Sequence, residues 1–436
     1  MSWPTEPLGA ICEIVSGITK DSKKQGDDYR EVPYLRVANV QRLQLNLSEV
    51  KTIPAKESTI ASYRLEPGDI LLNEGGDRDK LGRGWIWQGQ ISECIHQNHV
   101  FRARIRNGKA IPKWIAYYAN TNEARAYFLA TGKQTTNLAS ISKKNLGALP
   151  VPLPPVDIQE SIVAEIDTQL SRLDETVTTL QGIQAKLKQA RASILKAAVE
   201  GRLVETEANK FNAKLLDHLS SQDQHEGIAI PEGWSIHQAK TVCNSIESGT
   251  TPSKEHLRDS PDEAVPFIKV YHLTFIGKLS FWENKPTYVS KEYHSSKMKR
   301  SLTIPGDVLT NIVGPPLGKV SVVPSKSHEW NINQAIARFR CGPTLMPAFL
   351  AIYLQSYQAK SWLASTSKTT TSQVNLSISN SRLLPIPVPP FHEQEQIVAE
   401  VDRRFSVLDQ VEATVTASLA RCCVLRQAIL KRAFGG

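Results

Sequence analysis

The segment LPVPLPP at residues 149–155 returns as LPIPVPP at residues 384–390, an offset of 235 positions. The same offset relates QESIVAEID at 159–167 to QEQIVAEVD at 394–402. A constant offset over neighbouring segments, with no insertion or deletion between them, indicates an internal duplication. The chain of 436 residues therefore consists of one unit of roughly 200 residues used twice.

Each copy of the duplicated segment predicts an extended arm followed by one long helix. Alternating prolines cannot form a helix, because proline fixes φ and lacks an N–H donor. Residues 157–200, which follow the first arm, contain no proline and a single glycine. Apolar residues then recur every seven positions, as in a coiled-coil seam. The predicted seam comprises Ile166, Leu173, Leu180, Leu187 and Ile194 in the first helix, and Val401, Leu408, Val415, Cys422 and Ile429 in the second.

Two helices with one apolar seam each need a partner, and the simplest arrangement pairs them with each other. An approximate two-fold relation between the copies makes this pair antiparallel. We expect polar seam positions of one helix, such as Gln184 and Glu412, to lie at the level of apolar positions of the other. Independent packing of each helix on its own domain is the alternative.

The segments before the two arms also correspond, although more weakly. PGDILLN at 67–73 resembles PGDVLTN at 305–311, and each reads as a turn that leads into a β-strand. Lys/Thr-rich stretches at 131–136 and 367–372 precede both arms. Between these anchors the segments differ freely, which indicates one scaffold with two divergent surfaces.

These features resemble the specificity (S) subunit of type I restriction–modification systems. The resemblance rests on the LPxPxPP arm, the Gln-Glu…Ile-Val…Glu…Asp entry to a long helix and the Pro-Gly-Asp strand start, each present twice. It covers essentially the whole chain. It implies two target recognition domains that each read half of a bipartite double-stranded DNA target, and a helical spacer that docks two methyltransferase subunits, with restriction subunits as further partners. It also implies a non-catalytic chain with no cofactor, since methyl donor, ATP and Mg belong to the partner subunits.

The expected fold is α+β, with two globular α/β recognition domains joined by two long antiparallel helices as a coiled-coil spacer, in a pseudo-two-fold internal repeat. The expected limits are 1–150 for the first recognition domain, 151–204 for the first spacer helix, 205–230 for a linker, 231–384 for the second recognition domain and 385–436 for the second spacer helix.

The net charge of +9 follows the same division. Residues 1–150 carry a net +6 and residues 231–384 a net +7, whereas residues 151–230 carry −4 and residues 385–436 are neutral. A polyanion that touches two separate places explains this pattern.

Candidate DNA contacts are side chains on loops of the two basic segments that can reach phosphates or base edges. In the first segment they are Asn73, Arg78, Lys80, Arg83, Lys133, Gln134 and Thr135. In the second they are Asn311, Lys319, Lys368, Thr369, Thr370 and Ser372. We also weigh the plain alternatives that a surface lysine is merely solvated and that Asn73 and Asn311 close turns.

The sequence matches known enzyme motifs poorly. Gly314-Pro315-Pro316-Leu317 lacks the amide and the aromatic residue of an amino-methyltransferase tetrad, and Val320 follows Gly318-Lys319 where a Walker A motif needs Ser or Thr. Asp262 with Glu283 and Lys285 superficially fits a nuclease, and the loop 75–80 could hold an ion, but we expect no metal. The alternatives to the specificity subunit are a coiled-coil adaptor for other proteins and a self-contained DNA-modifying enzyme.

Composition agrees with a soluble protein, since mean hydropathy is −0.28 and no unbroken apolar run approaches the roughly 18 residues of a membrane helix. No secretory signal is visible, and the six cysteines show no C-x-x-C spacing. We therefore expect reduced thiols and a cytoplasmic location.

Overall fold

The structure, a computed structural model, describes residues 3–19, 28–134, 139–204, 231–314, 316–369 and 374–435. The predicted linker 205–230 lies outside this range. The chain divides into two compact units: the first holds Met1–Gln181 with Thr416–Gly436, and the second holds Gly182–Val415. This division falls within both long helices, and the expected limits of the recognition domains stay predictions.

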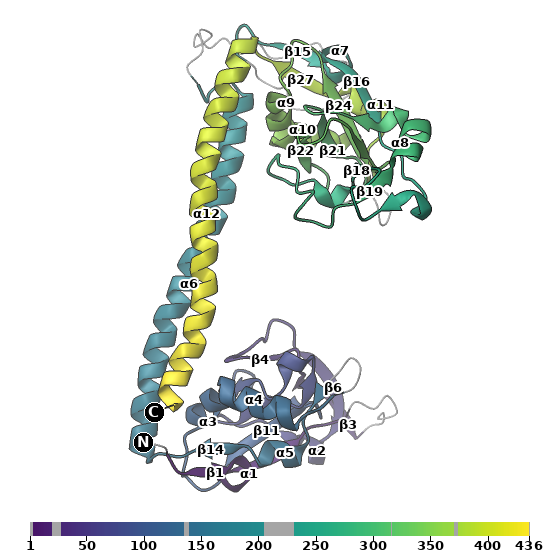
Figure 1. Cartoon of the computed structure of the whole chain (residues 1–436). Helices are drawn as coiled ribbons and strands as arrows, with labels where there is room; N and C mark the ends of the chain where they lie inside the picture. The colour runs from purple at the N-terminus through teal and green to yellow at the C-terminus, as the bar shows by residue number, and fades with distance from the viewer. Residues whose placement is uncertain are drawn as a thin grey trace. The chain divides into compact units, whose positions relative to one another are not determined.

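The first unit is built around a four-stranded sheet with the order β2-β11-β7-β9 and a second sheet with the order β10-β3-β6. Figure 1 labels β11 of the first sheet and β3 and β6 of the second. The sheet strands are β2 (Cys12–Ser16), β11 (Val100–Ile105), β7 (Ile70–Asn73), β9 (Gly84–Ile86), β10 (Ile95–His96), β3 (Tyr29–Leu35) and β6 (Lys51–Lys56). Shorter strands are β1 (Thr5–Pro7), β4 (Val40–Gln41), β5 (Gln44–Leu45), β8 (Gly75–Gly76), β12 (Lys133–Gln134), β13 (Ala139–Ser140) and β14 (Pro150–Pro152). The helices are α1 (Leu8–Ile11), α2 (Glu57–Tyr63), the 3-10 turn η1 (Arg78–Lys80), α3 (Pro112–Ala119), α4 (Asn122–Thr131) and α5 (Lys143–Gly147).

The second unit repeats this plan, with a four-stranded sheet of order β16-β24-β21-β22 and a five-stranded sheet of order β17-β19-β18-β23-β20. Its sheet strands are β16 (Cys243–Ser248), β24 (Ile336–Cys341), β21 (Val308–Asn311), β22 (Val320–Val322), β17 (Leu257–Arg258), β19 (Tyr288–Ser290), β18 (Ala264–Ile268), β23 (Trp330–Ile332) and β20 (Leu302–Thr303). Shorter strands are β15 (Ser235–Gln238), β25 (Lys368–Thr369), β26 (Val374–Asn375) and β27 (Pro385–Val388). The helices are α7 (Ala239–Val242), α8 (Lys291–Lys297), α9 (Pro347–Gln355), α10 (Tyr357–Thr366) and α11 (Ile378–Leu383), with the 3-10 turns η2 (Lys254–His256), η3 (Val270–His272) and η4 (Lys299–Ser301).

The proline arms are extended, as the sequence predicts, and each forms a strand at the edge of a two-stranded sheet. The first arm pairs as β14 with β1, and the second pairs as β27 with β15. Each two-stranded ribbon tolerates its prolines because an edge strand can leave donors unused. The arm then leads into α6 (Val156–Val199) in one copy and α12 (Phe391–Phe434) in the other, both of 44 residues.

A buried glutamine fixes the start of each long helix. Gln159 Nε2 donates to the carbonyls of Lys109 and Pro154, and its Oε1 accepts from the N–H of Ile111 at 3.1 Å. Gln394 makes the same three bonds at the equivalent places, to Thr344, Pro389 and Met346. Both glutamines are fully buried. The duplicated Gln therefore ties the arm, the long helix and the loop before α3 or α9 together in the two units.

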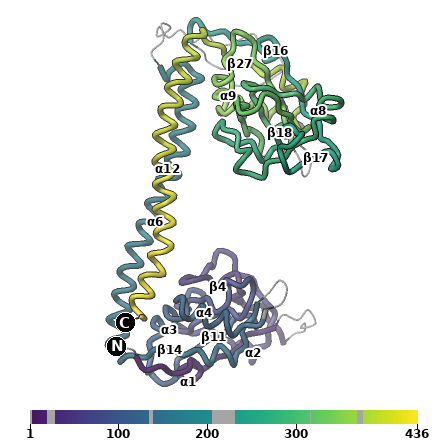
Figure 2. Tube along the Cα trace, in the orientation of Figure 1, coloured from purple at the N-terminus to yellow at the C-terminus, as the bar shows by residue number. Residues whose placement is uncertain are grey.

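The long helices are antiparallel within each unit. In the first unit, Val163, Ile166, Leu170 and Leu173 of α6 share a hydrophobic core with Cys422 and Leu430 of α12. Ile397, Val398 and Val401, near the start of α12, join Leu195 and Val199, near the end of α6, in a core of the second unit. The ten predicted seam residues are all buried or half-buried. Figure 2 places both ends of the chain in the first unit, where Trp3 and Ala433 line one small pocket.

One of the described helices, α12, is long and apolar enough by composition to cross a membrane, with an 18-residue window of mean hydropathy 1.2. Polar residues interrupt it, so it is no unbroken apolar run. Only 17% of that window is buried, and Val407, Val411, Val424 and Leu425 are exposed. Helix α12 thus carries exposed apolar residues in addition to those of its coiled-coil seam.

Candidate nucleic-acid interface

One loop in each unit combines glycine turns with cations. In the first unit it joins β7 to β9, and in the second it joins β21 to β22. An asparagine ends the first strand in both. Asn73 Nδ2 donates to the carbonyl of Val40 at 2.9 Å, whereas Asn311 Oδ1 accepts from the N–H of Lys319 at 2.9 Å. Both asparagines are buried, so their amides hold the protein's own backbone.

A glycine lets each loop lie close against a helix. Gly82 has a φ of 62°, and a Cβ there would meet the ring of Phe128 in α4. Gly318 has a φ of 95°, and a Cβ there would meet the side chain of Lys360 in α10. Positive φ values of this kind favour glycine. The cation that follows each glycine, Arg83 or Lys319, is thereby placed beside the helix.

In each unit, the glycine-containing loop and the Lys/Thr-rich stretch, which both hold candidate DNA contacts, come together in space. In the first unit, β13 pairs with both β12 (Lys133–Gln134) and β8 (Gly75–Gly76). In the second, Asn375 of β26 forms a bridge to Val313, while β26 also pairs with β25 (Lys368–Thr369). Segments about 60 residues apart in sequence therefore line the same edge of each unit.

Three guanidinium groups gather at this edge of the first unit. Burial lowers the pKa of Arg42, and the charges of Arg125 and Arg83 lower it further, with Asp79 opposing them. Burial also lowers the pKa of Arg83, whose Nε has no hydrogen-bond partner among the described residues. Arginine stays protonated regardless, and the carboxylates of Asp77 and Asp79 offset the charge of this cluster only in part, so a phosphate would be a further partner for it.

The second unit places lysines at the equivalent positions. Lys319 corresponds to Arg83, and its Nζ lies 3.4 Å from the carbonyl of Val270 and 5.8 Å from the ring centre of Phe275. Lys360 corresponds to Arg125, and burial lowers its pKa. Sequence reasoning identified Arg83 and Lys319 but missed Arg42, Arg125 and Lys360. Only the folded arrangement shows that these three converge on the loops.

The remaining predicted contacts fall into three groups. Arg78 and Lys133 are exposed, and Lys80 forms an ion pair with Asp77. Gln134, Lys368 and Thr369 lie in β12 and β25, as residues of the hairpins just described. Thr135, Thr370 and Ser372 lie outside the described residues. Asn73 and Asn311 stay predictions: both are buried and their Nδ2 groups donate to backbone carbonyls, which favours the alternative that they hold their loops, although Asn73 Oδ1 has no hydrogen-bond partner among the described residues.

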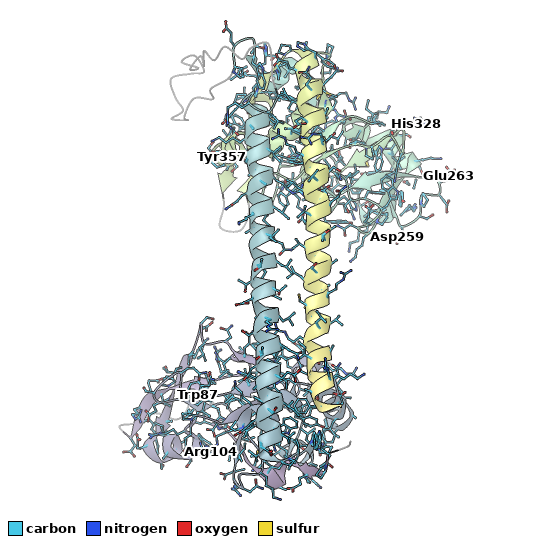
Figure 3. The ribbon with its side chains drawn as sticks, turned by 90° about the vertical axis from the view of Figure 1, so that its left-hand side faces the viewer. Trp87, Arg104, Asp259, Glu263, His328 and Tyr357 are labelled. Carbon is cyan, nitrogen blue, oxygen red and sulfur yellow. The ribbon has the colours of Figure 1, made fainter. Side chains whose placement is uncertain are left out.

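The arginines of the central strands serve the fold. Arg104 of β11 (Figure 3) binds the buried Asp69 through two hydrogen bonds of 2.7 and 2.8 Å. Arg340 of β24 binds Asp307 in the same way, at 2.9 and 2.8 Å. Each pair joins the Pro-Gly-Asp turn to the neighbouring strand, which explains why that motif recurs.

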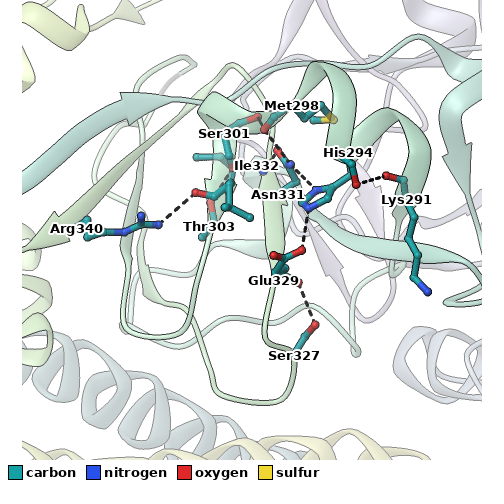
Figure 4. Close-up of polar contacts among 12 residues, drawn as sticks. Lys291, His294, Met298, Ser301, Thr303, Ser327, Glu329, Asn331, Ile332 and Arg340 are labelled. Atoms are coloured by element: carbon teal, nitrogen blue, oxygen red, sulfur yellow. Dashed lines mark hydrogen bonds and ion pairs between the residues drawn. The ribbon is translucent and has the colours of Figure 1, made fainter.

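A polar cluster in the second unit could suggest hydrolase chemistry, but its hydrogen bonds do not (Figure 4). His294 Nε2 lies 3.1 Å from Glu329 Oε2, and its Nδ1 lies 2.9 Å from Nδ2 of the buried Asn331. Ser327 Oγ donates to the backbone carbonyl of Glu329. Among the described residues this serine makes no bond to the histidine, so a nucleophile–base pair is absent there. The part of the chain described also holds no group of three His, Cys, Asp or Glu residues arranged for a metal.

Comparison with known proteins agrees with the repeat. The family model for the type I restriction modification DNA specificity domain matches residues 2–189 and again residues 231–419. The chain is 27% identical over 439 residues to the type I restriction enzyme EcoBI specificity subunit of Escherichia coli, covering all of this chain and 86% of the relative. It is 24% identical over 445 residues to the EcoKI specificity subunit of Escherichia coli strain K12, covering all of this chain and 89% of that one.

Solved structures share the fold. A chain from a structure on complex assembly and conformational transition of the type I R-M system aligns with a TM-score of 0.70 at 17% identity, covering 99% of this chain and 97% of the other. The HsdS subunit from Thermoanaerobacter tengcongensis aligns with a TM-score of 0.54 at 18% identity, covering 100% and 97%. With the family model matching both halves, the chain belongs to the type I restriction–modification DNA specificity family.

Proposed function

We propose that this chain is the DNA sequence-specificity subunit of a type I restriction–modification complex, and that each recognition domain reads one half of a bipartite target. The observation that carries the proposal is the equivalent placement of Arg83 and Lys319, each on a glycine-containing loop beside a second cation. Cations at equivalent places in two related units suit two contacts with one polyanion. The net charges of +6 and +7 lie on these same segments.

The long helices would set the unread gap between the two half-sites. Each has 44 residues, which corresponds to about 66 Å at 1.5 Å per residue. Their paired seams make a stiff spacer, so the gap would be a length that the protein measures.

Methyltransferase subunits would dock on the exposed apolar residues of α12. Val424 and Leu425 are 69% and 51% exposed in the first unit, and Val407 and Val411 are exposed in the second. The equivalent residues of α6 are Gln189, Ala190, Arg172 and Thr176, so this apolar surface belongs to one helix. Exposed apolar residues grouped in this way mark a partner surface.

Chemistry would then reside in the partners. The methyl donor, ATP and Mg would bind the methyltransferase and restriction subunits, and the specificity chain would bind no cofactor. We place the complex in the cytoplasm, where the six cysteines would stay reduced; the six are free thiols in the structure.

Methylome sequencing tests the proposal. The chain would be expressed together with a type I methyltransferase subunit, in a host without other DNA methyltransferases. We expect methylation at one bipartite motif, and none when either protein is expressed alone. Exchanging residues 1–150 for those of another family member should alter one half-site and retain the other. Methylation by the chain alone would establish a self-contained enzyme, and salt-independent, sequence-blind DNA binding would favour an adaptor.

A further inference from the structure

A short turn in the second unit presents two adjacent large apolar side chains to solvent. Phe275 is 45% exposed and Ile276 is 44% exposed, at the tip of the loop that joins η3 to β19. Burying such side chains in the core is the usual solution, and leaving two neighbours exposed on one tip has a cost unless a partner covers them.

The turn is held firmly on the edge of the central sheet. Thr274 accepts from the N–H of Val320 at 2.8 Å, and Gly277 accepts from the N–H of Val322 at 3.2 Å. Thr274 Oγ1 donates to the carbonyl of Lys278 at 2.6 Å, closing the turn on itself. Lys278 Nζ in addition lies 3.4 Å from Asp409 of α12. Phe275 and Ile276 therefore project from a pre-organised turn, so little ordering entropy opposes their binding.

One cation lies beside this apolar tip, and a second lies beside an exposed aromatic residue of the same loop. Lys319 lies 5.8 Å from the ring centre of Phe275 and also reaches the carbonyl of Val270. Lys269, which precedes the turn in the chain, lies 5.9 Å from the ring centre of Tyr271, which is itself 40% exposed. An apolar surface flanked by ammonium groups matches a nucleic acid, whose bases are flat and apolar and whose phosphates are anionic.

The equivalent turn of the first unit differs. There Arg42 and Leu43 occupy the tip between β4 and β5, and both are half-buried. Leu43 packs against the first unit's core, and Arg42 Nη2 donates to the carbonyl of Asp79 at 3.2 Å. One scaffold turn thus carries an internally bonded cation in one unit and an exposed apolar pair in the other.

We propose that the Phe275–Ile276 turn is an apolar wedge that packs against the bases of the DNA half-site read by the second domain. This rests on the proposed function and adds the residues and the kind of contact. Lys319 binds the adjacent phosphate and positions the wedge. A tip of two side chains is far smaller than the roughly 800 Å² per partner of a stable protein interface, which favours DNA over a protein as its occupant.

The test uses the complex of this chain with its methyltransferase and two duplexes, one with the mapped bipartite site and one with that site scrambled. Replacing both wedge residues, Phe275→Ala with Ile276→Ala, should weaken binding to the mapped site at least about tenfold. The slope of affinity against salt should stay unchanged, because no phosphate contact is lost. Methylome sequencing of this variant should show relaxed bases in one half-site only. Phe391→Ala, an exposed aromatic residue at the start of α12, is the matched control and should leave the affinity unaltered.

Unaltered affinity and unaltered half-site bases in the double variant would overturn the inference. So would loss of methyltransferase binding with DNA affinity intact, since the wedge would then contact protein. Failure of the unmodified complex to prefer the mapped duplex would instead contradict the proposed function itself. A folded variant is recognised by an unchanged far-UV circular dichroism spectrum and unfolding midpoint.

Discussion

Arg191 of α6 donates from Nη2 to Asp409 Oδ1 of α12 at 2.6 Å, and to Glu412 Oε2 at 2.9 Å. The duplication repeats this link, because Arg426 of α12 forms an ion pair with Asp174 of α6 in the first unit, and both residues lie 235 positions from their counterparts. Charged links at equivalent levels in both units select one antiparallel register, because any slip would leave these five charged groups unpaired at the seam.

Replacing Arg191 by alanine should loosen the helix pair in the second unit. Its side chain is largely buried, so the change removes two charge-assisted hydrogen bonds, and we expect a loss of about 1–2 kcal/mol. Hydrogen exchange of peptides around residues 187–195 and 405–412 should become faster. Arg403→Ala removes an exposed pair within α12 and is the control. Equal protection of these peptides from hydrogen exchange in both variants would show that the Arg191 link does not stabilise the helix pair.

The same link should respond to acid. Burial acts to raise the pKa of Asp409, but the hydrogen bond and charge of Arg191 outweigh it, so the pKa lies below its ordinary value. A depressed carboxyl pKa gives stability that is present above the unfolded pKa of about 4 and is lost as pH falls through the folded value. Protection of these peptides, taken relative to the intrinsic exchange rate at each pH, should therefore fall below pH 4 in the natural chain, and Asp409→Asn should remove that pH dependence.

Removing the buried glutamine should destabilise either unit to a similar degree. Gln159→Ala and Gln394→Ala each leave three backbone groups without partners at the base of a long helix. The expected loss is about 2–4 kcal/mol in each case. Denaturant unfolding checks this, with the exposed Gln189→Ala as control. A loss of stability in one unit but not in the other would contradict the structural equivalence of Gln159 and Gln394.

His96 should make the first unit sensitive to mild acid. Burial lowers its pKa to about 4, and its Nδ1 lies 2.6 Å from the carbonyl of Val100. The unfolded chain takes up the proton near pH 6.5 and the folded chain only near pH 4, so stability falls as pH drops through that window. The full loss is about 3 kcal/mol. His96→Ile, which installs the residue found at Ile332 in the second unit, should flatten the profile between pH 7 and 5.

Phosphate contacts should appear in the salt dependence of binding. Arg83→Ala and Lys319→Ala should each weaken binding to mapped and scrambled duplexes alike, and lower the slope of log affinity against log salt by about 1. Lys109→Ala serves as control, because that lysine pairs with Glu6. An unchanged slope in both variants would remove these loops from the interface.

Much of this architecture could be predicted from the sequence. The prolines at 149–155 define the arms, the seven-residue spacing from Ile166 defines the helices, and the Pro-Gly-Asp turns define the strand starts, because each of these signals is local. What could not be predicted depends on contacts between distant segments. Arg42 and Arg125 join Arg83 only through the hairpin and α4. Glu412 pairs with the cation Arg191, where the sequence predicted an apolar position of the other helix, because the register depends on which charges meet.

Asn73 and Asn311 show most clearly what the sequence alone cannot predict, namely whether a side chain is buried. An asparagine beside a glycine-rich loop has the same local sequence whether its amide reads a base or holds the backbone. The hydrogen bonds to Val40 and Lys319, which only the folded structure shows, favour the second role. The Arg83 and Lys319 positions remain candidates because the loops that these asparagines hold present them near other cations.

Lengthening both long helices should widen the gap in the DNA target without changing either half-site. Repeating Gln184–Ala190 within α6 and the equivalent Leu419–Leu425 within α12 adds seven residues to each, which preserves the seven-residue seam. Seven residues extend a helix by about 10.5 Å, the length of about three base pairs of DNA. Methylome sequencing should therefore show the same half-site bases separated by about three more positions. Lengthening α6 alone would misalign Arg191 with Asp409 and should abolish methylation. If the gap stayed constant while both helices were longer, the spacing would be set by the recognition domains, and if the bases changed instead, the helices would take part in reading the sequence.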